Sequence, residues 1–204
     1  AANENVGIGV DVFKALTAGD SCVAIGSYAL DALTTGDDNV AIGYLAGSGQ
    51  VGGNSNTYVG YKACETGNGG HYQVAIGQEA GKVSTANSTI FIGYQAGIAH
   101  TDGGNIIAIG PNAYDNADTE SANIAIGNNA LGGTVAGAEY NVCIGHNSGD
   151  ATTSGDGSTF IGHDAGTNHT TGGSNTCVGL RAGDSLTTGD NNTCIGLEAG
   201  SSGG

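Results

Sequence analysis

The sequence predicts an all-β fold, a parallel β-solenoid (β-roll) of about twelve 17-residue rungs stacked along one axis. The main observation is a motif, Val/Thr-x-Ile-Gly, that returns at a nearly constant spacing. Nine of the eleven intervals between motif glycines are 17 residues, one is 16 and one is 18, and a fixed period in this range is typical of repeat architectures. Twelve units of 17 account for all 204 residues, so we expect residues 1–204 to form a single repeat domain. The motif glycines are Gly9, Gly26, Gly43, Gly60, Gly77, Gly93, Gly110, Gly127, Gly145, Gly162, Gly179 and Gly196.

A second observation is the short β-branched segment before each motif glycine, which we number as position 0 of its unit. Position −1 is Ile in ten units and Val in two, and position −3 is Val, Ile or Thr in every unit. Such residues favour strands, in which alternate side chains point to opposite faces. We expect position −1 to point consistently into the core. This predicted repeat core comprises Ile8, Ile25, Ile42, Val59, Ile76, Ile92, Ile109, Ile126, Ile144, Ile161, Val178 and Ile195.

Position −2 of the same strand is also apolar. It is Ala or Gly in six units and an aromatic residue or Cys in the other six. A strand that is apolar on both faces is usually buried on both. We therefore expect one face to line the coil and the position −2 face to pack against another chain. This predicted assembly face comprises Tyr58, Phe91, Cys143, Phe160, Cys177 and Cys194.

The third observation is turn chemistry in the rest of each unit. Position +3 is Ala in ten of twelve units and position +10 is Gly in nine of eleven, which suits tight corners and close approach of neighbouring coils. Helix is not expected, because glycine interrupts every short window. Asn is frequent at position −4, where stacked side chains would form a hydrogen-bonded ladder. These are Asn5, Asn39, Asn56, Asn123, Asn141, Asn175 and Asn192.

Charge and composition exclude several classes of function. The formal net charge is −15, with only four Lys and Arg residues, whereas nucleic acids and anionic membranes bind basic patches. No apolar stretch is long enough for a membrane span, and no signal peptide is visible. The five cysteines include no CxxC pair, and we interpret them as small buried apolar side chains. Cys177 and Cys194 would lie on adjacent rungs, close enough for a disulfide.

The terminal units show no atypical sequence. Joining Gly204 to Ala1 would place the next motif glycine 17 residues after Gly196. Solenoids normally cover their open strand edges with atypical terminal units. We therefore expect the ends to be covered by more of the same structure. Either the chain is a piece of a longer fibre, or copies of it stack head to tail into a filament.

Several strings resemble known repeats. Asn39–Gly47 (NVAIGYLAG), Phe91–Gly97 (FIGYQAG) and Ala182–Thr193 (AGDSLTTGDNNT) resemble the NTAIGYQAL…NTTG repeats of phage tail-fibre-like proteins. The Val-Ala-Ile-Gly core also resembles the head repeats of YadA-type trimeric autotransporter adhesins, although those have a 14-residue period. The resemblance covers the whole chain. It implies a homotrimeric, left-handed β-solenoid shaft located on a virion, at the cell surface or otherwise outside the cell.

We therefore expect a structural fibre or filament shaft that assembles by rung stacking and by lateral packing of an apolar face. The alternative is a surface adhesin, with Tyr44, Tyr61 and Tyr94 at position +1 stacking on host glycans. A third interpretation is an ice-binding array of position +8 threonines. The alternative explanation for these threonines is that they are ordinary turn residues. These are Thr17, Thr34, Thr85, Thr101, Thr153, Thr170 and Thr187.

Catalysis is not expected, since no nucleophile elbow, P-loop or zinc motif appears. His146 and His163 share position +1 on adjacent rungs, and Asp164 follows His163. These three residues could hold a metal, but simple surface stacking is the favoured interpretation. No cofactor is expected beyond an occasional Ca²⁺ or other cation in Asp- and Asn-containing turns such as that of Asp37 and Asp38.

Overall fold

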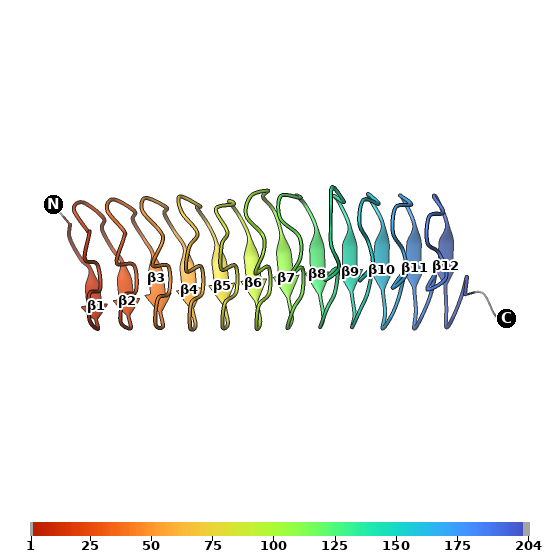
Figure 1. The fold of residues 1–204 in the computed structure, drawn as a ribbon, viewed down its shortest axis with the longest axis horizontal. Helices are drawn as coiled ribbons and strands as arrows, with labels where there is room; N and C mark the ends of the chain where they lie inside the picture. Colours follow the sequence, from red (N-terminus) through yellow and green to blue (C-terminus); the bar gives the residue numbers. More distant parts are fainter. Residues whose placement is uncertain (1, 202–204) are drawn as a thin grey trace.

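A computed structural model of the chain, described over residues 2–201, is a straight rod of stacked coils (Figure 1). Each coil contributes one three-residue strand, and all strands pair in parallel in one sheet with the order β1 to β12. Eleven intervals at the about 4.8 Å spacing of paired strands make this sheet about 53 Å long. The strands are β1 (Val6–Ile8), β2 (Val23–Ile25), β3 (Val40–Ile42), β4 (Thr57–Val59), β5 (Val74–Ile76), β6 (Ile90–Ile92), β7 (Ile107–Ile109), β8 (Ile124–Ile126), β9 (Val142–Ile144), β10 (Thr159–Ile161), β11 (Thr176–Val178) and β12 (Thr193–Ile195). The predicted β-solenoid with its 17-residue spacing is confirmed.

Equal repeat positions lie directly above one another. Val23 pairs with Val40 and Ile25 with Ile42, and the same register holds at every step. Backbone bonds between coils continue outside the strands, as in Gly47 N–H to Ala63 O at 2.9 Å. The units of 16 and 18 residues keep this register as well. The stack therefore behaves as one sheet wrapped around an axis.

Each coil turns at three residues with left-handed backbone conformation, at positions −5, +2 and +4. In the third coil these are Asp38 (φ 59°), Leu45 (φ 57°) and Gly47 (φ 62°). Single residues of L-configuration adopt this region at modest cost, with Asn and Asp among the most tolerant. Because these corners reverse the side-chain direction, the period-two alternation of the strand does not extend around the coil.

The motif glycine is required for two physical reasons. Gly43 has φ 141°, and the motif glycines as a group have values from 121° to 143°, a region that side chains rarely adopt. A Cβ atom on Gly43 would also lie 2.3 Å from the carbonyl oxygen of Gly60 in the next coil. The close approach of successive coils at this point explains why no other residue occupies position 0.

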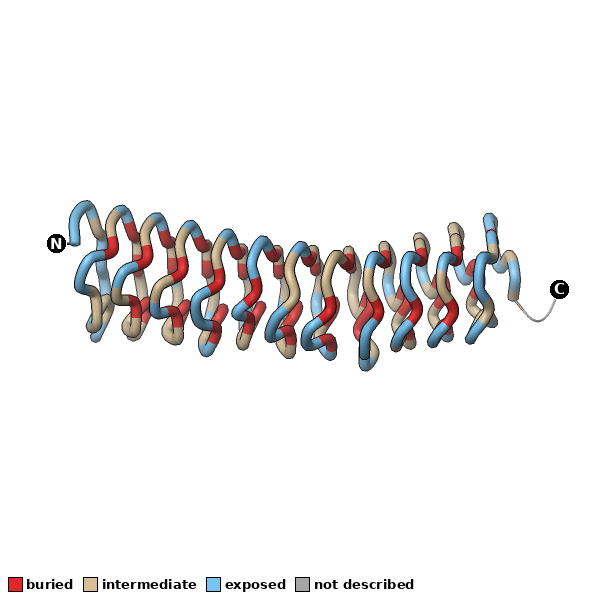
Figure 2. The backbone as a smooth tube through the Cα atoms, turned by 90° about the horizontal axis from the view of Figure 1, so that it is seen from above, coloured by how far each residue is buried: buried red, intermediate tan, exposed pale blue. Residues whose placement is uncertain are grey.

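The inside and outside of the strands are the reverse of those predicted. Position −2 points into the coil, so the predicted assembly face is buried: Tyr58, Phe91, Cys143, Phe160, Cys177 and Cys194. The predicted repeat core at position −1 lies on the outer face and is half-buried along most of the rod and exposed at both ends, where Ile8 and Ile195 are 60% and 69% exposed. Figure 2 shows the buried residues recurring at equal places from coil to coil. The physical reason is space, because the interior of a 17-residue coil is too narrow for a large side chain at every level.

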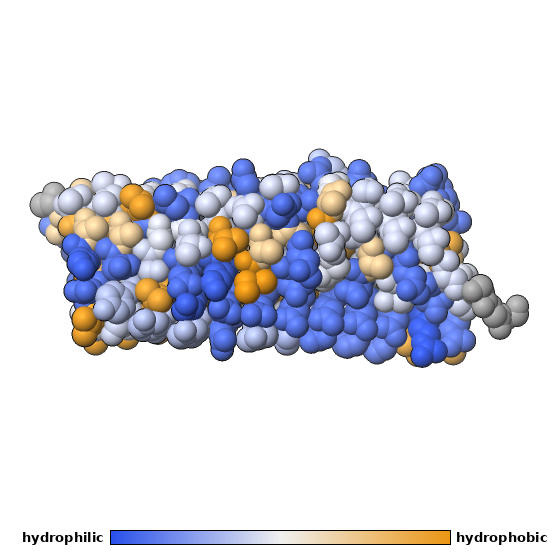
Figure 3. Space-filling model, viewed as in Figure 1, coloured by the Kyte–Doolittle hydropathy of each residue, from blue (hydrophilic) through white to orange (hydrophobic). Residues whose placement is uncertain are grey.

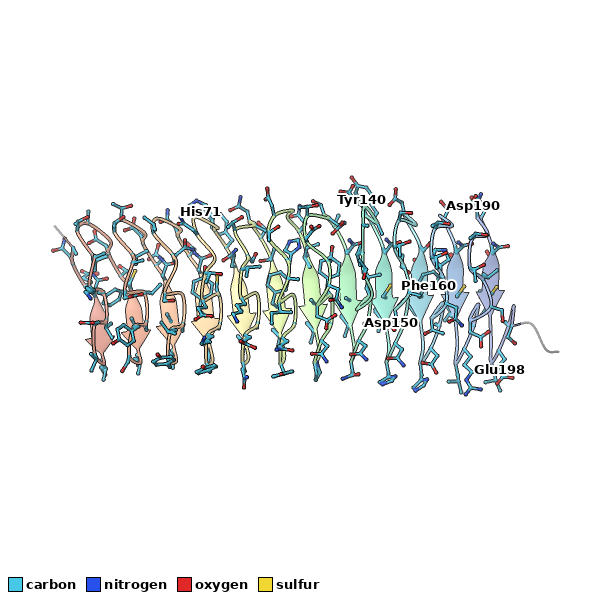
Figure 4. All side chains as sticks on the ribbon, in the orientation of Figure 1. His71, Tyr140, Asp150, Phe160, Asp190 and Glu198 are labelled. Carbon is cyan, nitrogen blue, oxygen red and sulfur yellow. The ribbon has the colours of Figure 1, made fainter. Side chains whose placement is uncertain are left out.

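The interior is filled by complementary sizes at positions −2 and +4. Phe91 and Phe160 occur in coils with glycine at +4, and a Cβ on Gly97 would lie 2.3 Å from the Phe91 ring. Where position −2 is the small Ala108 or Ala125, position +4 is Tyr114 or Leu131. Figure 4 shows Phe160 within the coil, while Tyr140 and Glu198 lie at opposite rims. Close packing is thus achieved by exchanging volume between two sides of one small core.

The position −4 residues form a ladder, although it runs through the backbone. The side chain of Asn56 accepts from the N–H of Gln73 in the next coil at 2.9 Å and donates to the carbonyl of Gly70 at 2.9 Å. Its own N–H donates to Asn39 Oδ1. The ladder therefore satisfies buried backbone groups at the corner that precedes each strand.

Candidate functional site

The first candidate site is the outer sheet face, which we define as positions −3 and −1 of all twelve strands. It presents two columns of Ile, Val and Thr residues, mostly half-buried, along the whole length of the rod. The opposite faces of strands β2 to β12 are buried. Continuous apolar strips on a protein surface mark interaction sites. Figure 3, in contrast, shows one side of the rod on which hydrophilic residues dominate and hydrophobic residues form only separate spots.

The second candidate site consists of the two edges of the sheet. β1 pairs only with β2, and β12 pairs only with β11. At every internal step, a position −3 N–H donates to a position −4 carbonyl of the next coil, as Val40 does to Asn56 at 2.8 Å. A position 0 N–H likewise donates to the position −1 carbonyl of the preceding coil. Within residues 2–201, each edge lacks one partner of each such bond.

The unpaired groups at the two edges are complementary. At the β12 edge, the N–H of Thr193 and the carbonyl of Ile195 have no partner within the described residues. At the β1 edge, the carbonyl of Asn5 and the N–H of Gly9 have none. Inside the rod, the N–H of Asn192 donates to Asn175 Oδ1 of the preceding coil at 2.9 Å. The N–H of Asn5 at one edge and Asn192 Oδ1 at the other are the donor and the acceptor for a bond of the same kind. A coil stacked on either edge would therefore find backbone donors and acceptors that match its own unpaired groups.

The third candidate site is the exposed column at position +1, at the corner beside the outer sheet face. The predicted glycan-binding residues Tyr44, Tyr61 and Tyr94 lie there, each a little under half exposed. The Tyr44 and Tyr61 rings stack with centroids 5.7 Å apart, and Tyr28 meets Tyr44 edge to face. Tyr44 and Tyr61 therefore pack against each other, while part of each ring remains exposed to solvent.

The same column carries the histidine pair noted in the sequence. The His146 and His163 rings are stacked with centroids 4.8 Å apart and an angle of 15° between their planes. His163 Nδ1 lies 2.9 Å from Asp164 Oδ2. Potential ligand atoms of these three residues all lie within 4.8 Å of one another. Adjacent coils thus bring two imidazoles and a carboxylate together at the surface.

The threonines of position +8 hold neighbouring coils together. The hydroxyl of Thr34 donates to the carbonyl of Val51 at 2.9 Å, and that of Thr170 donates to Thr187 at 2.8 Å. The hydroxyls of Thr17, Thr85, Thr101 and Thr153 make the same bond. These contacts are explained by a structural role of the threonines in the turns.

Several titratable residues lie inside the coil, where sequence reasoning did not place them. Burial lowers the pKa of His100 and of His169, and the Nδ1 atoms of both have no hydrogen-bond partner among residues 2–201. Tyr58 accepts from Gln50 at 2.9 Å and donates to Gln73 at 2.6 Å. The only sequence signal for these positions was their periodicity, because His100, His169 and Gln50 all stand at position +7.

The cysteines are buried thiols, as the sequence indicated. Burial raises the pKa of Cys64 to about 12, and it raises that of Cys177 to the same region. Cys177 and Cys194 are paired positions of β11 and β12, but they are free and no disulfide joins them. A thiol is a poor nucleophile when burial favours its protonated form. These side chains therefore serve as packing groups.

Comparison with protein-family models, with curated proteins and with solved structures finds no match to this chain. Residues 2–201 contain no helix long and apolar enough to cross a membrane. No pocket is found in the described part of the chain. The outer sheet face, the two edges and the position +1 column are therefore the surfaces from which a function can be argued.

Proposed function

We propose that this chain is a structural shaft of a fibre or filament in an extracellular, cell-surface or virion appendage. The observation that carries the proposal is the complementarity of the two edges. Thr193 N–H would donate to Asn5 O of a second copy, Gly9 N–H to Ile195 O, and Asn5 N–H to Asn192 Oδ1, each repeating an internal bond. Such a head-to-tail contact is heterologous and extends without closing.

Core volume also supports end-to-end stacking. The last coil carries two small residues, Cys194 and Gly200, at positions −2 and +4. The first coil carries Gly7 at position −2 and the partly buried Phe13 at position +4. Stacking would place Phe13 over the small residues of the last coil, so that volume is exchanged between neighbouring coils as in the interior of the rod.

Lateral packing through the outer sheet face is the second part of the proposal. The half-buried Ile and Val columns offer a flat apolar strip as long as the rod, and a homotrimer would cover three such strips. The acidic remainder of the surface, with net charge −15, would keep finished fibres apart. The shaft therefore needs no ligand and no catalytic group.

Thr193→Pro tests the end-to-end contact. It removes an N–H that has no partner within the rod, so we expect coils to remain folded while filaments seen by negative-stain microscopy shorten to single rods of about 53 Å. The matched control is Thr193→Val, which keeps the N–H and is expected to leave filaments long. Filaments of Thr193→Pro as long as those of the wild type would contradict the proposal.

Ile109→Lys tests lateral packing. It places a charge in the middle of the outer sheet face. In the Thr193→Pro background, where end-to-end stacking is blocked, we expect the mass measured by light scattering to fall to that of a single rod. Gln78→Lys, at the exposed position +1, serves as the charge-matched control and should leave the mass unchanged. A wild-type protein that is already monomeric at high concentration would remove the lateral part of the proposal.

An adhesin is the alternative, and the exposed position +1 tyrosines favour it. Aromatic faces of Tyr61 and Tyr94 could stack on sugar rings. Binding of the isolated chain to a glycan array, lost in Tyr61→Ala and Tyr94→Ala, would support this function. An array without binding would leave the shaft as the better description.

A further inference from the structure

Among residues 2–201, the histidine pair at position +1 and Asp164 form a compact group of potential metal ligands outside the assembly surfaces. His146 and His163 are exposed, and they follow the motif glycines of consecutive coils. The same column holds Asn128 on one side of the pair and Leu180 on the other. The cluster is thus confined to two coils and is distinct from the outer sheet face and from the two edges.

The backbone fixes the relative positions of the three residues. The N–H of Asp164 donates to the carbonyl of His146 at 2.9 Å, and Gly162 N–H donates to Ile144 O at 2.8 Å. Both bonds join the two coils immediately beside the histidines. Because these coils are rungs of a continuous sheet, the two Cα atoms are held in place before any ligand arrives, which reduces the entropy lost on binding.

The Asp164 carboxylate is held from two sides. Its Oδ1 accepts from Asn147 Nδ2 at 3.1 Å, and its Oδ2 lies 2.9 Å from His163 Nδ1. The Asp164 side chain is 19% exposed, whereas that of His163 is 53% exposed. The carboxylate is therefore held in place beside two solvent-accessible imidazoles before any ion binds.

We propose that His146, His163 and Asp164 form a surface site for a divalent transition-metal ion of the zinc, nickel and copper class. Two imidazoles and one carboxylate are ligands that suit these ions, and water would complete the coordination. Ligand atoms in a tetrahedral zinc site lie about 3.3 Å apart, given metal–ligand distances of about 2.0–2.1 Å. The present atoms lie within 4.8 Å of one another, and the two exposed rings would rotate to bring their nitrogens to this separation. Oxygen-preferring Ca²⁺ and Mg²⁺ are not expected to compete.

Titration of the metal-free protein with Zn²⁺ at pH 7.5 in a calorimeter tests the proposal. We expect one ion per chain, and binding that weakens strongly at pH 5 because protonated imidazoles cannot ligate. His146→Asn, His163→Asn and Asp164→Asn should each reduce affinity by about tenfold or more. Asn already occupies position +1 at Asn128 and position +2 at Asn147, so these variants are expected to fold.

His71→Asn is the matched control, because His71 lies at another corner and accepts the N–H of Asn54, a role that Asn87 plays toward His71 one coil later. It should bind Zn²⁺ as the wild type does. The thermal midpoint should rise with Zn²⁺ in the wild type and in His71→Asn only. Absence of stoichiometric binding, or undiminished binding in the His146→Asn/His163→Asn double variant, would overturn the proposal. Neither outcome bears on shaft assembly, which the edge variants test separately.

Discussion

The two faces of the strands follow opposite rules. On the outer face, position −1 is always Ile or Val, whereas on the inner face position −2 ranges from Gly7 and Ala108 to Phe91. The outer residue meets the same residue above and below it, so identical side chains pack well. The inner residue shares a narrow space with position +4 of its own and adjacent coils, so only the combined volume is constrained. In this fold the most constant strand position is therefore on the outer face, and the variable one is in the core.

The largest expected effect comes from removing volume inside. Phe91→Ala should lower the free energy of unfolding by about 3–5 kcal/mol, because it leaves a cavity between coils that cannot collapse. Adding Gly97→Leu should recover a large part of this loss, since Ala with Leu at position +4 is the natural pair of Ala125 and Leu131. Chemical denaturation of the single and double variants measures this. Additive destabilisation by the two changes would contradict the volume-exchange interpretation.

A smaller effect is expected from breaking the position −4 ladder. Asn56→Leu leaves the N–H of Gln73 without a partner inside the rod, and the carbonyl of Gly70 then accepts only from the Gln50 amide. Each unsatisfied buried group costs about 1–3 kcal/mol. Hydrogen exchange should show loss of protection centred on the coils of β4 and β5. Uniform loss along the whole rod would instead indicate that the sheet unfolds as a single unit.

The buried histidines predict that the stability of the fold depends on pH, an effect that the Ile, Val and Thr residues of the outer face cannot produce. Burial lowers the pKa of His100 and His169 in the folded state, so the unfolded chain binds more protons in the window below the ordinary His value of about 6.5. Stability should therefore be lost as the pH falls from 7 towards 5. The drop in thermal midpoint should be smaller in His100→Gln/His169→Gln. An equal drop in both proteins would assign the effect to other groups.

The smallest effect on stability is expected from a substitution on the outer face, compared with the same substitution at the adjacent inner residue. Ile107→Thr changes a half-buried position −3 residue to one found there in four other units, and should cost less than about 1 kcal/mol under conditions where rods do not associate. Ala108→Thr adds the same side chain one residue later, inside the coil, and should cost at least about 1–3 kcal/mol. Equal midpoints in denaturant would contradict the assignment of the two faces.

Periodicity was enough to predict the strands, their parallel order and their register, because every unit repeats the same backbone conformation around its motif glycine. It did not identify the inner face, since both faces of the strand are apolar. The useful signal was the compensation between Phe91 and Gly97 and between Ala125 and Leu131, which is visible in the sequence once positions −2 and +4 are compared. The interior locations of His100 and His169 could not be derived, because left-handed corners interrupt the alternation that strands obey.

The sequence also placed the histidine pair on adjacent rungs at a corner, and the structure brings the two rings together there. What the spacing could not give was the orientation of Asp164, which depends on the amide of Asn147 in the preceding coil. A contact of this kind arises from side-chain rotamers, and those are not encoded in the period of the repeat.

Units of unequal length keep the strands in register, and this has a consequence for how such rods change. The shorter unit omits a residue between Ser84 and Ala86, and the longer one gains a residue between Leu131 and Val135, while Ala86 and Val135 remain buried. Both alterations fall in the path from position +4 to the next strand and leave the motif glycines stacked. Longer loops could therefore be inserted in that segment. The rod would then gain local differences between coils while the spacing between successive coils stays the same.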